Sequence, residues 1–97
     1  MAAFLMFGNY SQDALSGISP RRTEEFVQLV AQNGGSVRAM FATLGEIDLV
    51  LVVDLPSVET AARVSIEVAK KMGIRLNTHP AIAVKDFDLL MTSGTSD

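Results

Sequence analysis

Residues 44–56, L-G-E-I-D-L-V-L-V-V-D-L-P, contain the clearest strand signal in the chain. Asp48 and Asp54 bracket five consecutive apolar residues, Leu49 to Val53, that show no polar alternation. A short apolar run between turn residues is typical of a strand that is buried on both faces. We therefore predict that residues 49–53 form a central strand of a sheet.

Two more strands are predicted on the N-terminal side of this segment. Residues 3–10 begin with large apolar side chains on both alternating sides, Phe4 to Phe7, so this strand is also expected to be covered twice. Residues 36–44 form the next strand, and Gly45-Glu46 provides the turn of a hairpin. Alternation places Val37, Ala39 and Phe41 on one side of this strand and Arg38, Met40, Ala42 and Leu44 on the other.

Two long helices are predicted from their boundary residues. The first begins at Ser19-Pro20, an N-cap followed by proline at the first helical position, and ends at Asn33-Gly34-Gly35. The second begins at Ser57 and ends at Gly73, since glycine suits the left-handed conformation at a helix C-terminus. A shorter helical turn is predicted at residues 11–17.

The last strand is predicted at residues 74–84, where one side carries Arg75, Asn77, His79 and Ala81. Pro80 lacks a backbone N–H for sheet pairing, so the pattern favours an edge strand. Residues 85–91 are expected to form a short helix. A single domain would then span residues 1–91, and residues 92–97 are expected to be a flexible tail.

The order strand, helix, strand, strand, helix, strand predicts an α+β fold. Two crossover helices of this length would pack on one face of a four-stranded antiparallel sheet, which is the ferredoxin-like βαββαβ arrangement. Its first and third strands are central, in agreement with the two strands that lack polar alternation here. The other face is expected to carry Met40, Leu44 and one side of the first strand, so we predict that a second subunit covers it, sheet against sheet.

The composition narrows the class of protein. At 97 residues with 48% hydrophobic residues, the chain is apolar for a small monomer, which favours burial against a second copy. A net charge of −3 argues against binding to nucleic acid or to anionic membranes. No apolar run approaches the ~20 residues that cross a bilayer. Because the chain has no cysteine and no basic leader, a cytoplasmic protein is expected.

Three segments together resemble a known family: FLMFGNYSQDALSGI at residues 4–18, GGSVRAMFATLGEIDLVLVVDLP at residues 34–56 and AIAVKDFDLL at residues 81–90. Their order resembles the GYD-domain family. That resemblance implies a dimeric α/β barrel, in which two ferredoxin-like sheets face each other, and implies no particular function.

The family takes its name from a glycine followed by a tyrosine and an aspartate at the hairpin. Gly45 and Asp48 match this pattern, whereas Ile47 stands at the tyrosine position. A role that needs a phenol is therefore not expected at this turn. A backbone role for Gly45 and a polar role for Asp48 remain.

His79 is the only histidine of the chain, and histidine is the side chain that titrates near neutral pH. On the predicted last strand it shares a side with Asn77 and Arg75, and this polar stripe could line a cavity between two sheets. A base beside a cation and an amide could bind an anionic or enolic small molecule. The simpler alternative is an edge-strand histidine that is solvated or hydrogen-bonded across a dimer interface.

Asp48 and Tyr10 complete the candidate ligand-binding residues. Asp48 is expected to bind turn amides or Arg38 across the hairpin, a structural role that competes with a functional one. Asp54 is expected to end its strand near the start of the next helix. Tyr10 could donate its hydroxyl into a cavity, although a tyrosine in the core or at its rim is more common.

Two arginines at the start of the first long helix, Arg21 and Arg22, are expected to be solvated. One histidine and no cysteine leave no metal-ligand cluster within the chain, and no cofactor is expected.

The sequence is consistent with two functions. The first is a homo-oligomeric protein that binds a small molecule or serves in assembly without catalysis. The alternative is a cofactor-independent oxygenase or isomerase that acts on a small enolisable or aromatic substrate in the barrel cavity. The alternative rests on analogy with other dimeric barrels and on His79, Asn77 and Arg75 sharing a face.

Overall fold

The computed structural model describes residues 1–93 of the chain, which form one antiparallel sheet and four helices. Their order is β1 (Ala2–Tyr10), α1 (Gln12–Ser16), α2 (Pro20–Gln32), β2 (Ser36–Ala42), β3 (Leu49–Leu55), α3 (Val58–Met72), β4 (Ile74–Ala81) and α4 (Val84–Ser93).

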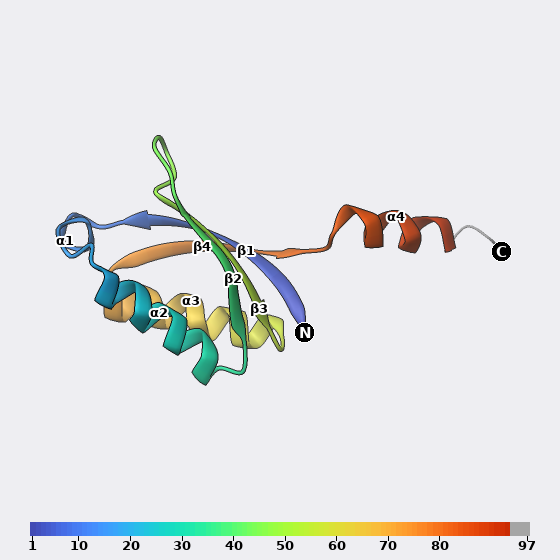
Figure 1. Ribbon diagram of the computed structural model, residues 1–97, viewed down its shortest axis with the longest axis horizontal. Coiled ribbons are helices and arrows are strands. Elements are labelled where there is room, and N and C mark those ends of the chain that lie inside the picture. Colours follow the sequence, from blue (N-terminus) through green and yellow to red (C-terminus); the bar gives the residue numbers. More distant parts are fainter. Residues whose placement is uncertain (94–97) are drawn as a thin grey trace.

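The four strands lie in the order β2-β3-β1-β4, and every neighbouring pair is antiparallel. β1 and β3 are therefore central, and α2 and α3 both cover the same face of the sheet (Figure 1). This is the predicted α+β, ferredoxin-like arrangement, to which α1 and α4 are added. Edge placement of β4, expected from Pro80, is confirmed.

Helix boundaries follow the capping residues. The Ser19 side chain accepts a hydrogen bond from the Arg22 amide at the start of α2, and Ser57 accepts one from the Thr60 amide at the start of α3. At the end of α3, Gly73 has a φ of 67°, the left-handed conformation that glycine adopts without steric cost. These caps fix both long helices where the sequence predicts them.

The core lies between the sheet and the two long helices. Alternate residues of β1 and β3 point toward the helices, so that Met6 pairs with Leu51 and Phe4 with Val53. The buried side chains that fill this layer are Phe4, Met6, Phe26, Leu29, Val30, Leu51, Val53, Leu55, Ala61, Val64, Val68 and Ile74.

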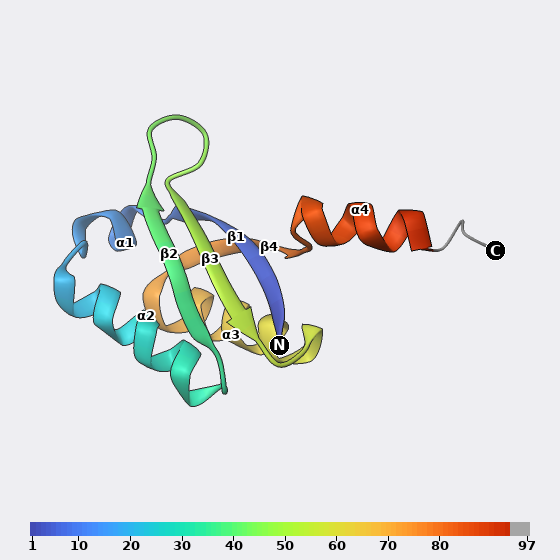
Figure 2. The ribbon, with the colours of Figure 1, turned by 45° about the vertical axis from the view of Figure 1, so that its right-hand side comes forward.

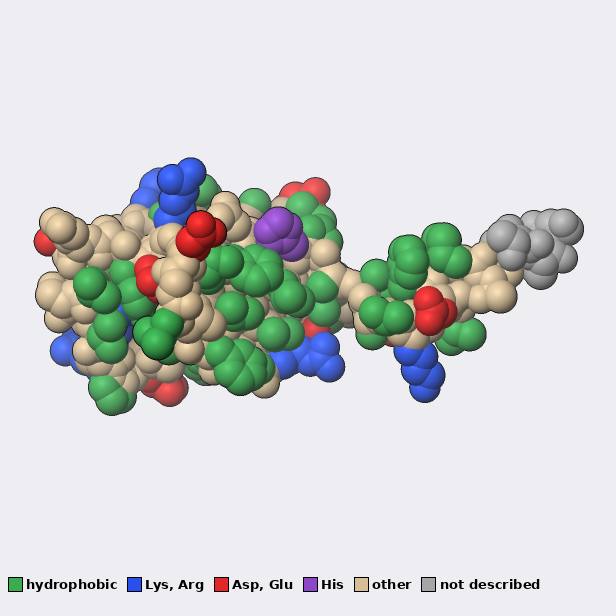
Figure 3. All heavy atoms as spheres, turned by 90° about the horizontal axis from the view of Figure 1, so that it is seen from above, with side chains coloured by type: hydrophobic (Ala, Val, Ile, Leu, Met, Phe, Trp, Pro, Cys, Tyr) green, Lys and Arg blue, Asp and Glu red, His purple; other side chains and the backbone are tan. Residues whose placement is uncertain are grey.

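No helix of residues 1–93 covers the opposite face of the sheet, and we call it the open face (Figures 1 and 2). It carries Leu5 and Phe7 from β1, Val50 and Val52 from β3, and Phe41 from β2. Figure 3 looks onto this face and shows hydrophobic side chains joined into a broad patch, with His79 at its margin. Large apolar patches of this kind mark interaction surfaces in soluble proteins.

Two residues predicted for the open face are found elsewhere, and a β-bulge explains the first. The β2–β3 pairing shifts between Val37 and Ala39, so Val37 and Met40 both point toward the helices while Phe41 points outward. β2 also ends at Ala42, and Leu44 is fully exposed in the loop that follows. The prediction for Met40 and Leu44 was therefore wrong, and Phe41 occupies the open face instead.

The last helix stands apart from the rest of the chain. β4 ends at Ala81, earlier than predicted, and α4 projects away from the sheet and from the two long helices (Figures 1 and 2). α4 extends to Ser93, so two residues of the expected 92–97 tail are helical; residues 94–97 lie outside the described part. Among residues 1–93, no helix combines the length and apolar character that crossing a bilayer requires.

Candidate functional site

A hollow on the open face contains two of the five candidate residues. Phe7 of β1, Asn77 and His79 of β4, and Ile47 of the β2–β3 loop line it. The strand register sets this arrangement, because Phe7 pairs with Asn77 and Leu5 with His79. The hollow is open to solvent in the single chain.

His79 is held in the hollow by an aromatic contact. Its ring lies edge-on to that of Phe7, with ring centroids 5.4 Å apart and planes inclined by 72°. Among the described residues that line the hollow, His79 is the only histidine, and its ring nitrogens can donate or accept a hydrogen bond. The Asn77 amide beside it offers both a hydrogen-bond donor and an acceptor.

Arg75 shares the side of β4 with His79 and Asn77, as predicted, but lies further along the strand. Its backbone pairs with Asn9, near the end of β1, and its side chain is exposed. The predicted polar stripe therefore exists along the edge of the open face, with two of its three members in the hollow.

Asp48 ties the β2–β3 loop to the end of β1. One oxygen of its carboxylate accepts a hydrogen bond from the Tyr10 amide at 2.9 Å, and its own amide donates to the Gly8 carbonyl at 2.9 Å. The contact with Arg38 that the sequence suggested is not formed; Arg38 lies 3.4 Å from Asp54 instead. Asp54 lies within β3, one residue before its end.

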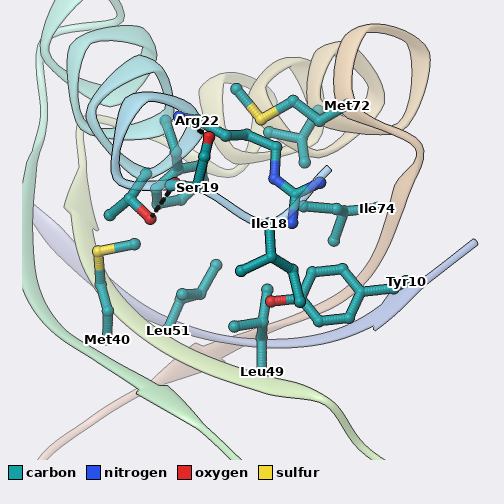
Figure 4. A pocket seen from close by; sticks show the side chains of 12 residues that line it. Tyr10, Ile18, Ser19, Arg22, Met40, Leu49, Leu51, Met72 and Ile74 are labelled. Carbon is teal, nitrogen blue, oxygen red and sulfur yellow. Dashed lines mark hydrogen bonds between the residues drawn. The ribbon is translucent and has the colours of Figure 1, made fainter. Parts of the chain in front are cut away.

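Tyr10 lies on the helix side of the sheet, whereas His79 lies on the open face. The Arg22 guanidinium sits 5.1 Å above the centre of the Tyr10 ring, a cation–π contact (Figure 4). Arg22 also donates to the Ala14 carbonyl, which holds α1 against α2. The expectation of a solvated side chain was wrong for Arg22, and it holds for Arg21, which is exposed.

The sequence does contain a signal for Arg22. It precedes the buried Phe26 by four residues and therefore lies on the same side of α2. An arginine in line with a buried stripe extends its aliphatic stem over apolar surface while its charged end stays near water.

Below Arg22 and Tyr10 is a cavity of about 60 Å³. It lies between α2, α3, the sheet and the segment after α1, it opens to the surface, and its lining is mostly apolar (Figure 4). This cavity and the hollow lie on opposite faces of the sheet. Among residues 1–93, no three His, Cys, Asp or Glu side chains lie close enough together to hold a metal ion.

The fold and these sites define a ferredoxin-like protein with an open apolar sheet face. The sequence matches the GYD domain family over residues 4–91, and the chain belongs to that family. Comparison with curated proteins and with solved structures gave no match.

The three positions of the family name lie in the β2–β3 loop. Gly45 has a φ of 123°, which explains a glycine there, and Asp48 anchors the end of β1. Ile47, at the tyrosine position, lines the hollow beside His79. Ile47 therefore gives the hollow an aliphatic side chain on the side of the loop.

Proposed function

We propose that the protein is a homodimer that binds a small molecule between two facing sheets. The observation that carries the proposal is the open face, where Leu5, Phe7, Phe41, Val50 and Val52 form one apolar surface. A second copy of the same face would remove this surface from water and would close the hollow around His79 and Asn77.

α4 supports the same proposal. It has ten residues, and an isolated helix shorter than about 12–15 residues is marginal in water. Val84, Phe87 and Met91 follow the spacing of one helical side and are 73%, 45% and 51% exposed. Because α4 points away from its own sheet, we propose that this side packs on the second copy.

The expected ligand is a small anionic or aromatic compound. In the dimer, His79 and Asn77 would supply hydrogen bonds and Phe7 an apolar wall. No observation in the described residues favours the oxygenase or isomerase alternative, which stays a prediction. The proposal includes a cytoplasmic location, in line with a chain that has no cysteine for disulfides.

Light scattering after gel filtration tests the assembly. The wild-type chain is expected at twice its mass of 10.4 kDa at micromolar concentration. Phe41→Glu places a charge in the proposed interface and should raise the dimer dissociation constant roughly 100-fold or more. Ile66→Glu is the matched control, since Ile66 on the outer side of α3 is 55% exposed and Phe41 is 59% exposed.

A monomeric wild type, or equal effects of the two variants, would overturn the dimer. Ligand binding is then read from the imidazole proton signals of the single histidine while small anionic and aromatic compounds are added. Compounds that shift these signals in the wild type but not in Phe41→Glu support a site closed by the dimer. Shifts of equal size in both proteins would show that the hollow binds these compounds without the dimer.

A further inference from the structure

The cavity on the helix side has the features of a second binding site, separate from the open face. Its floor is formed by buried side chains from three elements: Phe26 of α2, Leu51 of β3 and Val68 of α3. Ile18, in the segment between α1 and α2, stands at its mouth and is exposed (Figure 4). An apolar space that opens to the surface can take up the tail of a small molecule.

Methionines make the walls of this cavity adaptable. Met40 of β2 and Met72 of α3 both line it, and each is half-buried. Methionine is unbranched and flexible, so it can move to fit an incoming group. The bulge in β2 turns Met40 toward the cavity, because without it the alternation would point Met40 to the open face.

The mouth of the cavity carries a positive charge without an ion-pair partner. Arg22 is half-buried, and the three ion pairs among residues 1–93 do not include it. One of its N–H groups donates to the Ala14 carbonyl, which leaves further donors of the guanidinium fork for a ligand. The cation–π contact with the Tyr10 ring helps to hold the guanidinium at the cavity.

We propose that this cavity binds a small aliphatic carboxylate. Its carboxylate pairs with the Arg22 guanidinium, whose planar fork matches two carboxylate oxygens. Its chain enters the space between Met40 and Met72. An apolar cavity of about 150 Å³ holds benzene, which has six carbons, so 60 Å³ takes a chain of about two to three carbons.

The methyl groups of the five methionines provide the test. In a ¹H–¹³C spectrum of the full chain, Met40 and Met72 report on the cavity, and Met1, Met6 and Met91 report on other places. Straight-chain carboxylates from acetate to octanoate are titrated, together with 1-pentanol as an uncharged partner for pentanoate. We expect shifts at Met40 and Met72 only, affinity that rises up to about butanoate and then levels, and at least tenfold weaker binding of the alcohol.

Two neighbouring arginines give matched variants. Arg22→Gln should remove the preference for acid over alcohol, whereas Arg21→Gln should leave it unchanged because Arg21 is exposed and pairs with Glu25. Arg22 also holds α1, so Val68→Leu is a second variant, which fills the floor and should weaken pentanoate at least tenfold with the arginine intact.

Three results would overturn the carboxylate site: no methionine shift at 10 mM pentanoate, equal binding of acid and alcohol, or equal effects of the Arg21 and Arg22 variants. The titration is repeated in Phe41→Glu, where binding should persist because the cavity lies on the other face of the sheet from Phe41. This repeat separates the carboxylate site from the proposed dimer.

Discussion

Asp48 shows how one side chain can hold a loop and a strand together. Its carboxylate binds the Tyr10 amide, while its backbone amide and carbonyl bond to Gly8 and Thr43. The carboxylate therefore satisfies the last amide of β1 at the point where the strand leaves the sheet. This is a structural role, and it accounts for an aspartate in the loop without any ligand.

Asp48→Ala should destabilise the fold by about 1–2 kcal/mol, because a hydrogen bond to a charged group is lost and the Tyr10 amide loses its partner. Urea unfolding measures this change as a lower transition midpoint. Glu46→Ala is the control in the same loop; the Glu46 side chain is exposed and only its carbonyl is used, by Asn9, so a change within about 0.5 kcal/mol is expected. Equal stability of the two variants would contradict the anchoring role.

The contact between Tyr10 and Arg22 could not be predicted from the sequence. β1 is apolar on both sides, so its pattern does not say which side faces the helices, and Tyr10 could be assigned to either. Its partner Arg22 comes from another element, and their contact depends on how α2 crosses the sheet. Contacts between elements are set by packing, which the pattern along one element does not contain.

At the level of elements, the turn from α2 into β2 leaves no room for a side chain at Gly35. A Cβ on Gly35 would lie 2.1 Å from the Asp54 carbonyl oxygen, far inside van der Waals contact. Gly34 before it has a φ of 82°, in the left-handed region. The two glycines are required for different reasons: close approach at Gly35 and backbone conformation at Gly34.

Gly35→Ala should therefore cost more than Gly34→Ala. We expect about 1 kcal/mol for Gly34→Ala, from the left-handed backbone, and at least about 3 kcal/mol for Gly35→Ala, because β2 must move away from β3. Thermal unfolding of both variants measures the order of these effects. The reverse order, or a small effect at Gly35, would show that the junction relaxes easily.

The elements themselves were largely predictable, because serine N-caps, C-terminal glycines and the alternation of apolar residues mark the boundaries within each segment. All four strands and both long helices occur in the predicted segments, although β2 and β4 end earlier than predicted. The bulge after Val37 was not predictable, since Ala39, Met40 and Phe41 beyond it are all apolar and a one-residue shift among them leaves no mark in the pattern. Because of that single shift, Phe41 rather than Met40 lies on the open face.

At the level of the whole molecule, the cavity has a cost. At about 24 cal/mol per Å³, a closed void of 60 Å³ would lower stability by about 1.4 kcal/mol, and this cavity costs less than that because it opens to the surface. A domain of this size has a total stability of roughly 5–15 kcal/mol. A bound aliphatic chain would recover part of this loss, so a carboxylate that fits should also raise the unfolding temperature.

The contribution of α4 to assembly can be tested within the intact chain. Phe87→Glu and Met91→Glu place charges on the side proposed to meet the second copy, and each should raise the dimer dissociation constant at least tenfold. Lys85→Glu introduces the same residue on another side of α4 and should change the dimer dissociation constant little. Analytical ultracentrifugation over a range of concentrations measures all three. If Lys85→Glu is as disruptive as Phe87→Glu, the effect is one of net charge and α4 does not pack on the partner.

A short helix that stands alone on a two-residue connection has a consequence for how the assembly behaves. If α4 becomes helical only when it meets a second copy, part of the intrinsic interaction energy goes into ordering that segment. The net affinity is then lower than the contact surface suggests, and subunits should exchange readily between pairs. Such exchange would allow mixed assemblies with other chains that have the same open sheet and a similar terminal helix.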